Sequence, residues 1–429
     1  MAENSIYAVV LAAGQGTRMK SALPKVLHKI AGRPMVSHLL ATVDSLHAEK
    51  AVVVVGPNME QVAQAVAPHA VAVQHKQLGT GDAVKAARDA LQGAKGSVLV
   101  LYGDTPLVRK ETLKAMIAER ENGADVVVLG FCPADPARYG RLIVGKDGLE
   151  KIVEFKDASE SERAVRLCNS GVMCIAAEKL FGWLDRLTND NAAGEYYLTD
   201  LVALARADGG KAVAIECAES EVAGANSRAD LAAIEAAVQN EMREKFLAQG
   251  VTMIDPKTVY FSYDTVLGKD VVIEPNVIFE TGCVVEDDVE IKGFCHFEGT
   301  HIRSGAKVGP FARLRPESDI GENCHIGDFV EIKKSVIESG AKVNHLSYIG
   351  DARIGAKTNI GAGAFIGSNT IIVAPCTIED GAMTAAGSVI TKTVGKNAMA
   401  VARGKQTVLD GWAEKFREQK KALKESLKK

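Results

Sequence analysis

A glycine-rich loop near the start of the chain carries residues suited to binding phosphate. Residues 11–19 read Leu-Ala-Ala-Gly-Gln-Gly-Thr-Arg-Met, and Pro-Lys-Val-Leu follows at residues 24–27. Gly14 and Gly16 have no Cβ, so the backbone can approach a ligand closely and its N–H groups can form a nest for an anion. Arg18 and Lys25 add two cations within reach of the same place. We therefore expect the loop to bind a phosphate chain.

Several interpretations of this loop use different parts of the string. A bare Gly-x-Gly is also what a tight turn between a strand and a helix contains. The dinucleotide fingerprint is excluded because Met19 stands at its third glycine position, and a Walker loop is excluded because no Gly-Lys-Ser/Thr ending follows. The full string, up to Pro24 and Lys25, resembles the signature of the sugar-1-phosphate nucleotidyltransferases. This resemblance favours nucleotide binding over an incidental turn.

Two further stretches place polar residues where apolar ones end. Residues 74–83 form a second glycine turn, Gln-His-Lys-Gln-Leu-Gly-Thr-Gly-Asp-Ala. Thr80 is a possible helix N-cap there, but the place of this turn opposite the first loop favours a role in binding a base. Residues 98–102 are apolar and are followed by Gly103 and Asp104. Mg²⁺ prefers one or two carboxylates together with phosphate oxygens, so Asp104 is a candidate ligand, with a capping role as the alternative.

The pattern of residues 5 to about 225 supplies a scaffold for these groups. Apolar strand candidates alternate with helical stretches, as in an α/β fold whose parallel sheet is covered by helices on both faces. We expect strands at residues 6–11, 51–55, 71–73, 98–102 and 125–131, and helices at residues 35–47, 59–66, 81–91 and 111–121. Ligands of such folds bind beyond the carboxyl ends of the strands. The glycine loop and Asp104 both lie at such ends.

Shorter strands interrupted by polar residues follow after residue 131. They contain the strings Tyr-Gly-Arg at 139–141, Val-Glu-Phe-Lys-Asp at 153–157, Cys-Asn-Ser-Gly at 168–171 and Gly-Glu-Tyr-Tyr-Leu-Thr-Asp at 194–200. Each string alone is compatible with turn chemistry or a solvated strand edge. Together they offer the hydrogen-bonding groups that the hydroxyls and acetamido group of a sugar require. Asn226 opens the next helix, where an N-cap is its simplest role.

A helix and an internal repeat make up the second half. Residues 227–247 carry apolar side chains at spacings of three and four, which predicts a helix that packs on one face and connects two domains. From Leu267 to Ile390 aliphatic residues recur every six, apart from three steps of five. The side chain four residues after each of them is usually small or a valine. Twenty-two positions share this register, which predicts a parallel β-helix of triangular section with Ile354, Ile360 and Ile366 in successive positions.

The composition excludes several classes of protein. A chain of 429 residues is long enough for two or three domains, and its net charge of −3 gives no bulk electrostatic reason to expect nucleic acid or an anionic membrane as a partner. No secretion-type leader and no membrane-spanning apolar run is visible, so we expect a cytoplasmic protein. The eight cysteines form no Cys-x-x-Cys pair, which predicts reduced, buried thiols. Four of them are expected to pack inside the repeat: Cys283, Cys295, Cys324 and Cys376.

Longer strings identify a family over essentially the whole chain. After the glycine loop come Gln-Leu-Gly-Thr-Gly, Leu-Tyr-Gly-Asp, Gly-Glu-Tyr-Tyr-Leu-Thr-Asp, Gly-Pro-Phe-Ala-Arg-Leu-Arg-Pro and Asn-His-Leu-Ser-Tyr-Ile-Gly-Asp. In this order they resemble the bacterial bifunctional N-acetylglucosamine-1-phosphate uridyltransferase/glucosamine-1-phosphate acetyltransferases. The resemblance implies a Rossmann-like α/β nucleotidyltransferase domain followed by a left-handed parallel β-helix of hexapeptide repeats. It also implies a homotrimer that makes UDP-N-acetylglucosamine for peptidoglycan and lipopolysaccharide synthesis.

By this resemblance, the first domain joins UTP to N-acetylglucosamine-1-phosphate with Mg²⁺ and releases pyrophosphate. Arg18 and Lys25 would stabilise charge on the triphosphate, and Asp104 and Asn226 would hold the metal, which revises the capping role of Asn226. Gln74, Gly79 and Thr80 would surround uracil, and Gly140, Glu154, Asn169 and Thr199 would hold the sugar. Further residues expected to contact the nucleotide or the product are Leu11, Ala12, Ala13, Gly14, Tyr102 and Gly103.

The β-helix domain, again by resemblance, would acetylate glucosamine-1-phosphate with acetyl-CoA. The catalytic base of the family falls on His345, and an imidazole can accept a proton from an amine near neutral pH. The sugar-phosphate positions fall on Arg315, Lys333, Tyr348 and Asn359, and those near coenzyme A fall on Ala362, Ser368, Ala386 and Arg403.

The same resemblance sets the expected boundaries of the domains. It gives a uridylyltransferase domain at residues 1–226, a linker helix at 227–250, a β-helix domain at 251–404 and a tail at 405–429. The tail carries eight basic and four acidic residues, which favours a solvated helix over a binding patch. Trp412 and Phe416 are expected to hold this helix against the β-helix.

One stretch departs from the pattern of the family. After Gly363 the family has about one further coil, with an Asn-Tyr-Asp-Gly loop that carries active-site asparagine, tyrosine and lysine, whereas here Ala364 follows at once. We expect the six-residue register to survive this loss, and acetyl transfer to be weak or absent while uridylyl transfer stays intact. The alternatives are a uridylyltransferase alone, another sugar-1-phosphate nucleotidyltransferase, or a non-catalytic regulatory subunit of the same architecture. Arg18, Lys25 and Asp104 argue against the last.

Overall fold

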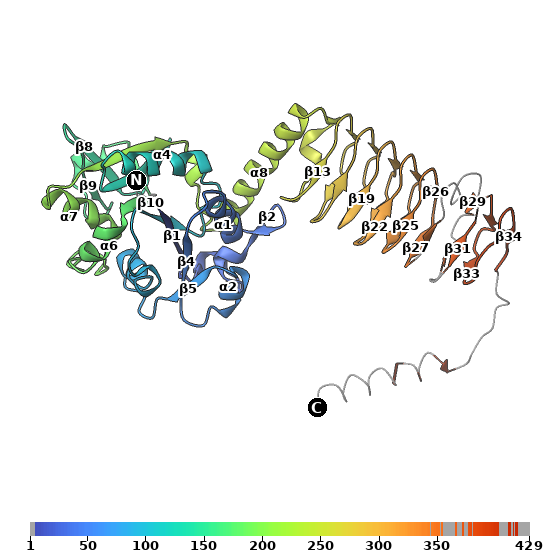
Figure 1. Cartoon of the computed structure of the whole chain (residues 1–429), viewed down its shortest axis with the longest axis horizontal. Coiled ribbons are helices and arrows are strands. Elements are labelled where there is room, and N and C mark those ends of the chain that lie inside the picture. The colour runs from blue at the N-terminus through green and yellow to red at the C-terminus, as the bar shows by residue number, and fades with distance from the viewer. Residues whose placement is uncertain are drawn as a thin grey trace. The chain divides into compact units, whose positions relative to one another are not determined.

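The computed structural model describes most of the chain as two compact units (Figure 1). The first comprises Met1–Glu244 with Phe261–Tyr263, and the second comprises Lys245–Tyr260 with Asp264–Lys429. The division falls inside helix α8 (Arg228–Ala248), the helix predicted at residues 227–247. The structure describes residues 5–343, 345–351, 353–354, 365–366, 371–372, 376–379, 381–402, 411–412, 415 and 417–418.

A twisted mixed sheet organises the first unit. Its strands follow the order β11-β7-β10-β6-β1-β4-β5. Their bounds are β1 (Ile6–Leu11), β4 (Lys50–Val55), β5 (Ala70–Val73), β6 (Ser97–Tyr102), β7 (Val126–Phe131), β10 (Cys168–Ala176) and β11 (Ala212–Cys217). All five predicted strands are present, with ends within one residue of the prediction. The β8 (Arg141–Gly145) and β9 (Gly148–Val153) hairpin extends the sheet beside β10, and β2 (Lys29–Ile30) pairs with β3 (Arg33–Pro34).

The prediction of a parallel sheet holds for the five predicted strands but fails where β10 and the β8–β9 hairpin join them. β10 runs antiparallel to both of its neighbours, β6 and β7. The chain leaves β7 through the β8–β9 hairpin and then returns, so this connection needs no helical crossover of the kind that parallel strands require. Apart from the pairs made by β8, β9 and β10, the neighbouring strands of this sheet pair in parallel, including β1 with β4 and with β6. The carboxyl end of β1 therefore stays next to that of β6, where Asp104 follows.

Helices cover both faces of the sheet, as predicted. Side chains of β1 alternate between the two cores, because Ala8 and Val10 pack on one side and Val9 on the other. The first core also contains residues of α1 (Met35–Ser45), α2 (Glu60–Ala65) and α4 (Lys110–Glu121). The second contains residues of α3 (Thr80–Lys85), α6 (Ala177–Leu184) and α7 (Leu201–Ala207), while α5 (Glu160–Arg163) is a short surface helix. This double covering holds the strand ends in fixed positions.

The second unit is a left-handed parallel β-helix of triangular section, as the repeat predicted. One face consists of β12 (Thr252–Met253), β14 (Val272–Ile273), β17 (Glu290–Ile291), β20 (Lys307–Val308), β23 (His325–Ile326) and β26 (Lys342–Val343). The second face consists of β13 (Val266–Leu267), β16 (Val284–Val285), β19 (Thr300–Ile302), β22 (Ser318–Ile320), β25 (Val336–Ile337), β28 (Arg353–Ile354) and β31 (Thr377–Ile378).

The third face and a short sheet complete the β-helix. The third face consists of β15 (Ile278–Phe279), β18 (His296–Phe297), β21 (Arg313–Leu314), β24 (Glu331–Lys333), β27 (Tyr348–Gly350), β30 (Ile371–Ile372) and β33 (Val389–Ile390). A three-stranded sheet contains β29 (Phe365–Ile366), β32 (Met383–Thr384) and β34 (Met399–Ala400). The aliphatic residues of the repeat point inward and are buried wherever their burial is described. The four cysteines of the repeat are also buried, as predicted, whereas Cys132 of the first unit is exposed.

The six-residue register does not survive unchanged, contrary to the prediction. Paired residues on successive coils are usually 17 or 18 residues apart, as in Ile332 with Ile349. Ile349, however, pairs with Ile372, and Ile354 pairs with Ile378. This coil therefore holds about six residues more than its neighbours. Unbroken steps of six would pair Ile354 with Ile372, so the prediction that the regular series continues through this coil is wrong. Ile360, which belongs to the predicted series, lies outside the described residues.

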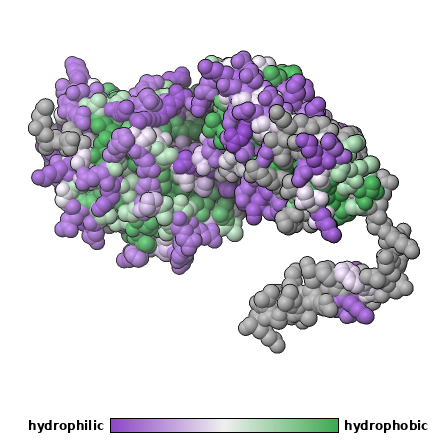
Figure 2. Space-filling view, turned by 45° about the vertical axis from the view of Figure 1, so that its right-hand side comes forward, coloured by the Kyte–Doolittle hydropathy of each residue, from purple (hydrophilic) through white to green (hydrophobic). Residues whose placement is uncertain are grey.

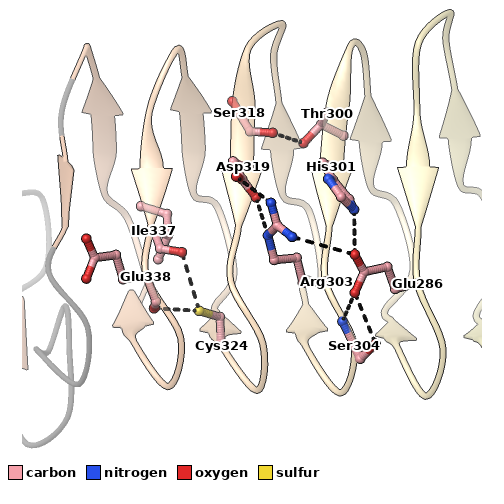
Figure 3. A network of polar contacts seen from close by, with 10 residues as sticks. All are labelled: Glu286, Thr300, His301, Arg303, Ser304, Ser318, Asp319, Cys324, Ile337 and Glu338. Atoms are coloured by element: carbon pink, nitrogen blue, oxygen red, sulfur yellow. Dashed lines mark hydrogen bonds and ion pairs between the residues drawn. The ribbon is translucent and has the colours of Figure 1, made fainter.

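Polar contacts between coils reinforce the second face of the β-helix (Figure 3). His301 Nε2 lies 2.7 Å from Glu286 Oε1, and Arg303 donates two hydrogen bonds to the carboxylate of Asp319, at 2.8 and 2.9 Å. Ser304 donates to the other oxygen of Glu286 through its backbone and its hydroxyl group. The same view shows the thiol of Cys324 beside backbone carbonyls of the next coil. These groups satisfy one another, which indicates a structural rather than a catalytic role.

Candidate active site for nucleotide and sugar phosphate

The glycine loop follows β1 and turns into a short 3-10 helix, Thr17–Met19. Gly16 adopts a left-handed backbone conformation with φ of 61°, and a Cβ at this position would lie 2.6 Å from Cβ of Lys25. Only glycine therefore allows the loop to pass this close to Lys25. A Cβ on Gly14 would meet nothing within 4 Å, so the chain is open at that point.

Four predicted residues meet beside this loop. The Lys25 ammonium contacts the carboxylate of Asp104 and lies 3.3 Å from Oδ1 of Asn226. The Arg18 guanidinium donates to the same Oδ1 at 2.7 Å. The side chains of Lys25 and Asp104 are only 15% and 17% exposed, so their attraction is less screened than that of a surface pair. The structure thus brings together two cations and two oxygen ligands.

Asp104 and Asn226 fit a cation, because their oxygens converge on a single ammonium group. Mg²⁺ takes oxygen ligands and is commonly held by one or two protein side chains together with phosphate oxygens and water. Across the part of the chain that the structure describes, no group of three or more His, Cys, Asp or Glu side chains could hold a metal by itself. The donor set therefore suits a metal that arrives with a nucleotide.

The capping alternatives for Asn226 and Thr80 do not hold. Ser227 and Asp230 cap α8 instead, since Ser227 Oγ accepts from the Asp230 amide and the Asp230 carboxylate accepts from the amides of Asn226 and Ser227. The Asn226 side chain is thereby left to face Arg18 and Lys25. Gly79 occupies the N-cap of α3, and the Thr80 hydroxyl accepts from the Leu198 amide at 3.1 Å.

A cavity of about 280 Å³ opens beside these groups. Ten of its lining residues were expected from the sequence: Leu11, Ala12, Ala13, Gly14, Lys25, Gln74, Gly79, Thr80, Tyr102 and Asp104. Sequence reasoning missed the other four, Val26, Gln77, Ala83 and Glu195. Gln77 gives no composition signal, yet its side chain donates to the Ala13 carbonyl at 2.6 Å and so joins the two glycine turns. A more open hollow of about 520 Å³, around Lys245 and Lys269 of the second unit, contains no predicted site residue.

The predicted sugar residues lie next to the nucleotide groups. A Cβ on Gly140 would be 3.4 Å from the Glu154 carboxylate, and the Thr199 hydroxyl lies 3.4 Å from Glu154 Oε1. The backbone N–H of Asn169 donates to the Gly140 carbonyl at 2.9 Å. Burial is the main reason why the pKa of Glu154 is raised above 4.5. These four residues therefore form one polar group.

Tyr102 connects the two halves of the site. Burial, together with the charges of Asp104 and Glu154, raises the pKa of its hydroxyl group, which stays neutral. Gly171 has φ of 89°, and a Cβ there would lie 2.6 Å from the Tyr102 ring, so glycine permits the close contact. Gly103 follows Tyr102, and its amide donates to the Leu11 carbonyl at 2.9 Å. The glycine loop and the strand that leads to Asp104 are thus fixed to each other.

The predicted acetyltransferase residues lie partly outside the described chain. Arg315 and Lys333 occupy the same register position on successive coils, and Arg315 forms an ion pair with Glu331 at 2.9 Å. Tyr348 begins β27, and His345 is exposed on the bend before it. Ala386 is exposed between β32 and β33. The residues outside the described part are Asn359, Ala362, Ser368, Arg403 and, in the tail, Phe416.

Comparison with known proteins agrees with this geometry. A family model described as the MobA-like NTP transferase domain matches residues 8–251, and one described as the GMPPB C-terminal domain matches residues 296–402. Fold and site together define a nucleotidyltransferase joined to a β-helix domain. Its curated relatives include the "Bifunctional protein GlmU" of Paramagnetospirillum magneticum, which is 55% identical over 445 aligned positions and is covered over 99% of both chains.

Other relatives carry the same name. The bifunctional protein GlmU of a Ruegeria species is 54% identical and that of Paracoccus denitrificans is 51% identical, with coverage of 96–98% of the chains. The chain belongs to the GlmU family, as its motifs predicted. The Paramagnetospirillum alignment has 445 positions against 429 residues here, so at least sixteen positions have no counterpart in this chain. This difference agrees with the loss of a coil.

Proposed function

We propose that the chain is a bifunctional enzyme of UDP-N-acetylglucosamine synthesis. It acetylates glucosamine-1-phosphate with acetyl-CoA and then transfers a uridylyl group from UTP to N-acetylglucosamine-1-phosphate. Membership of the GlmU family supports both activities, and no comparison favours uridylyl transfer alone, another sugar nucleotidyltransferase or a non-catalytic subunit. The observation that carries the first activity is the meeting of Arg18 and Asn226 with Lys25 and Asp104, two residues that line the cavity.

Uridylyl transfer needs little from the protein beyond position and charge. A phosphate oxygen of the sugar phosphate attacks the α-phosphorus of UTP, and pyrophosphate leaves. Arg18 and Lys25 lie where they can neutralise charge on the triphosphate, while the loop amides at Ala13 and Gly14 can donate to it. Asp104 and Asn226 would hold Mg²⁺, which supplies further charge neutralisation when bound. No protein nucleophile is required.

The remaining groups position the two substrates. Gln74, Gly79 and Thr80 line the cavity where uracil would bind. Gly140, Glu154, Asn169 and Thr199 would hold the sugar, because the Glu154 carboxylate and the Asn169 amide can bond to hydroxyl and acetamido groups. UTP and acetyl-CoA are cytoplasmic substrates, which supports a cytoplasmic location. Among the described helices, none is long and apolar enough to cross a membrane.

For acetyl transfer we assign His345 as the base that takes a proton from the amine of glucosamine-1-phosphate. Arg315 and Lys333 project from adjacent coils, so their charges suit the phosphate. Tyr348 and Asn359 would complete the sugar-phosphate site, and Ala362, Ser368, Ala386 and Arg403 would line coenzyme A. The amide bond forms as coenzyme A leaves as a thiol.

We also propose a homotrimer assembled through the β-helix. Figure 2 shows a surface that is largely hydrophilic but includes hydrophobic areas. Three exposed phenyl rings, Phe294, Phe311 and Phe329, stack along one corner, with centroids 4.9 and 4.8 Å apart. Contiguous exposed apolar groups of this kind mark interaction surfaces. Light scattering should give the mass of three 45.5 kDa chains, falling for Phe311→Ser but not for Val144→Ser in the first unit; a wild-type monomer would contradict the proposal.

The decisive assay measures pyrophosphate release with four nucleoside triphosphates and three sugar-1-phosphates. We expect Mg²⁺-dependent turnover with UTP and N-acetylglucosamine-1-phosphate. Preference for GTP, or for glucose-1-phosphate, would instead support another nucleotidyltransferase. Absence of turnover with every pair would support a regulatory subunit.

A further inference from the structure

The side chain of Gln74 is held by two hydrogen-bond acceptors. Its Nε2 lies 3.0 Å from the carbonyl oxygen of Gly79 and 2.8 Å from Oδ2 of Asp82. Gln74 is only 5% exposed, yet it lines the nucleotide cavity. Asp82 stands in the first turn of α3, and its carboxylate also lies 3.4 Å from the Leu78 amide.

These neighbours determine which end of the Gln74 amide faces them. A backbone carbonyl and a carboxylate have no hydrogen to donate, so the atom that lies beside both must be the NH₂ group. Both N–H bonds are thereby used, and the carbonyl oxygen Oε1 is turned away. Among the residues that the structure describes, none donates a hydrogen bond to Oε1. A fully buried Oε1 would then be a buried polar atom without a partner, and it is not one, so Oε1 is accessible.

We propose that Asp82 determines the base specificity of the enzyme by fixing the orientation of Gln74. This inference rests on the proposed uridylyl transfer and on Gln74 facing the base. With Nε2 held by Asp82 and Gly79, the cavity presents an acceptor, which matches the N3–H of uracil. Cytosine has an unprotonated N3, so two acceptors would face each other without a proton between them. A site built around a hydrogen bond rejects a ligand that cannot make it, because a polar group is left unpaired.

Removing Asp82 should weaken this choice. The Gln74 amide would then be held by the Gly79 carbonyl alone. Rotation of the amide presents its NH₂ group to the base, which suits cytosine, and in the variant this rotation would cost one hydrogen bond instead of two. The test compares kcat/KM for UTP and CTP in the full-length wild type and in Asp82→Ala, with Mg²⁺ and N-acetylglucosamine-1-phosphate. We expect the UTP-to-CTP ratio to fall at least about tenfold, mainly through KM.

Matched variants separate orientation from general damage. Asp82→Asn keeps an acceptor oxygen and should retain most of the preference for UTP. Asp82→Ser has a shorter side chain and should lower this preference as Asp82→Ala does, so it provides the test if Asp82→Ala folds poorly. Asp89→Ala removes an exposed carboxylate farther along the same segment and should change nothing. Equal loss of activity toward UTP and CTP, or an unchanged ratio in Asp82→Ala and Asp82→Ser, would overturn the inference. A wild type that does not use UTP would overturn the proposed function instead.

Discussion

The guanidinium of Arg18 donates a 2.7 Å hydrogen bond to Oδ1 of Asn226, although 208 residues separate the two in the chain. Arg18 comes from the glycine loop after the first strand, and Asn226 immediately precedes the capped start of α8. The glycine loop is therefore closed by the segment that leads into α8. Neither segment alone contains a complete site.

Removal of the Arg18 charge should slow uridylyl transfer strongly. We expect Arg18→Ala to lower kcat/KM at least a hundredfold, which corresponds to about 3 kcal/mol of transition-state stabilisation. Lys20→Ala, which removes an exposed cation two residues later, is the matched control and should have little effect. Pyrophosphate release measures both. A rate unaffected by Arg18→Ala would remove this residue from the mechanism.

Uridylyl transfer should require Mg²⁺ and should stop when a chelator removes it. Asp104→Asn keeps the shape of the side chain but removes its charge, so the Mg²⁺ concentration for half-maximal rate should rise at least about tenfold. Glu119→Gln, on α4, is a control outside the cavity. Binding of Mn²⁺ with UTP, followed by electron paramagnetic resonance, gives a second measurement. Equal metal dependence in wild type and Asp104→Asn would show that Asp104 is no ligand.

Sugar binding should depend on the ionisation of Glu154. Burial, the largest cause, raises the pKa of Glu154 above 4.5, and the neighbouring acidic groups add to this shift. The carboxylate, which accepts from sugar hydroxyls, is present only above this raised pKa. KM for N-acetylglucosamine-1-phosphate should therefore increase on acidification at a higher pH than an ordinary glutamate would give. Glu154→Gln should raise KM at all pH values and abolish this step; a step that persists in the variant would assign it to another group.

Arg228 should act on the same reaction through the position of the loop. Its Nε donates to the Met19 carbonyl at 3.2 Å, and Nη1 lies 3.2 Å from Nδ1 of His28. Burial first, and then the charge of Arg228, lowers the pKa of His28, which is therefore neutral at neutral pH. Arg228→Ala should free the loop ends and lower kcat about tenfold. Arg206→Ala on α7 is the control, and equal rates in both variants would contradict this role.

Acetyl transfer should be slow but should depend on His345. The sequence contains no Asn-Tyr-Asp-Gly loop, which the resemblance leads us to expect in the acetyltransferase site, and each oxyanion-type donor deleted from an active site costs about 3 to 4 kcal/mol. Release of free thiol from acetyl-CoA, at saturating glucosamine-1-phosphate, measures the rate. His345→Ala should abolish it, while uridylyl transfer stays unchanged. Fast turnover in the wild type would show that neighbouring groups replace the lost ones.

The sequence contained most of the fold because its signals were local. A run of apolar residues at 6–11 predicted a strand, and the recurrence of aliphatic residues after Leu267 predicted the β-helix. The structure contains both. The sequence did not reveal that β10 runs antiparallel, because the apolar pattern of residues 168–176 does not depend on the direction of the strand. The β8–β9 hairpin determines the direction of β10, because it sets how the chain returns from β7 to the sheet.

The sequence predicted the site residues that belong to a recognisable motif, but not those whose role depends on contacts between distant parts of the chain. The glycine string led to Arg18 and Lys25, and the apolar run at residues 98–102 led to Asp104; the structure brings the three side chains to one place. Gln77, Asp82 and Arg228 act through contacts with the backbone or with another side chain, and no spacing in the chain reveals such partners. The longer coil was concealed for a related reason. The sequence keeps its period of six there, and only the strand pairs show that Ile354 pairs with Ile378 and not with Ile372.

The longer coil interrupts the regular spacing of the β-helix at one place, while strand pairing continues across it. A stack in which each turn touches only its neighbours behaves as a nearly one-dimensional polymer, whose cooperativity depends on every junction. At this coil β30 pairs with β27 and β31 pairs with β28, with about six more residues between the partners than in the preceding coils. Because the coupling between neighbouring turns depends on how regularly they stack, we expect the unfolding of the β-helix to be least cooperative at this coil.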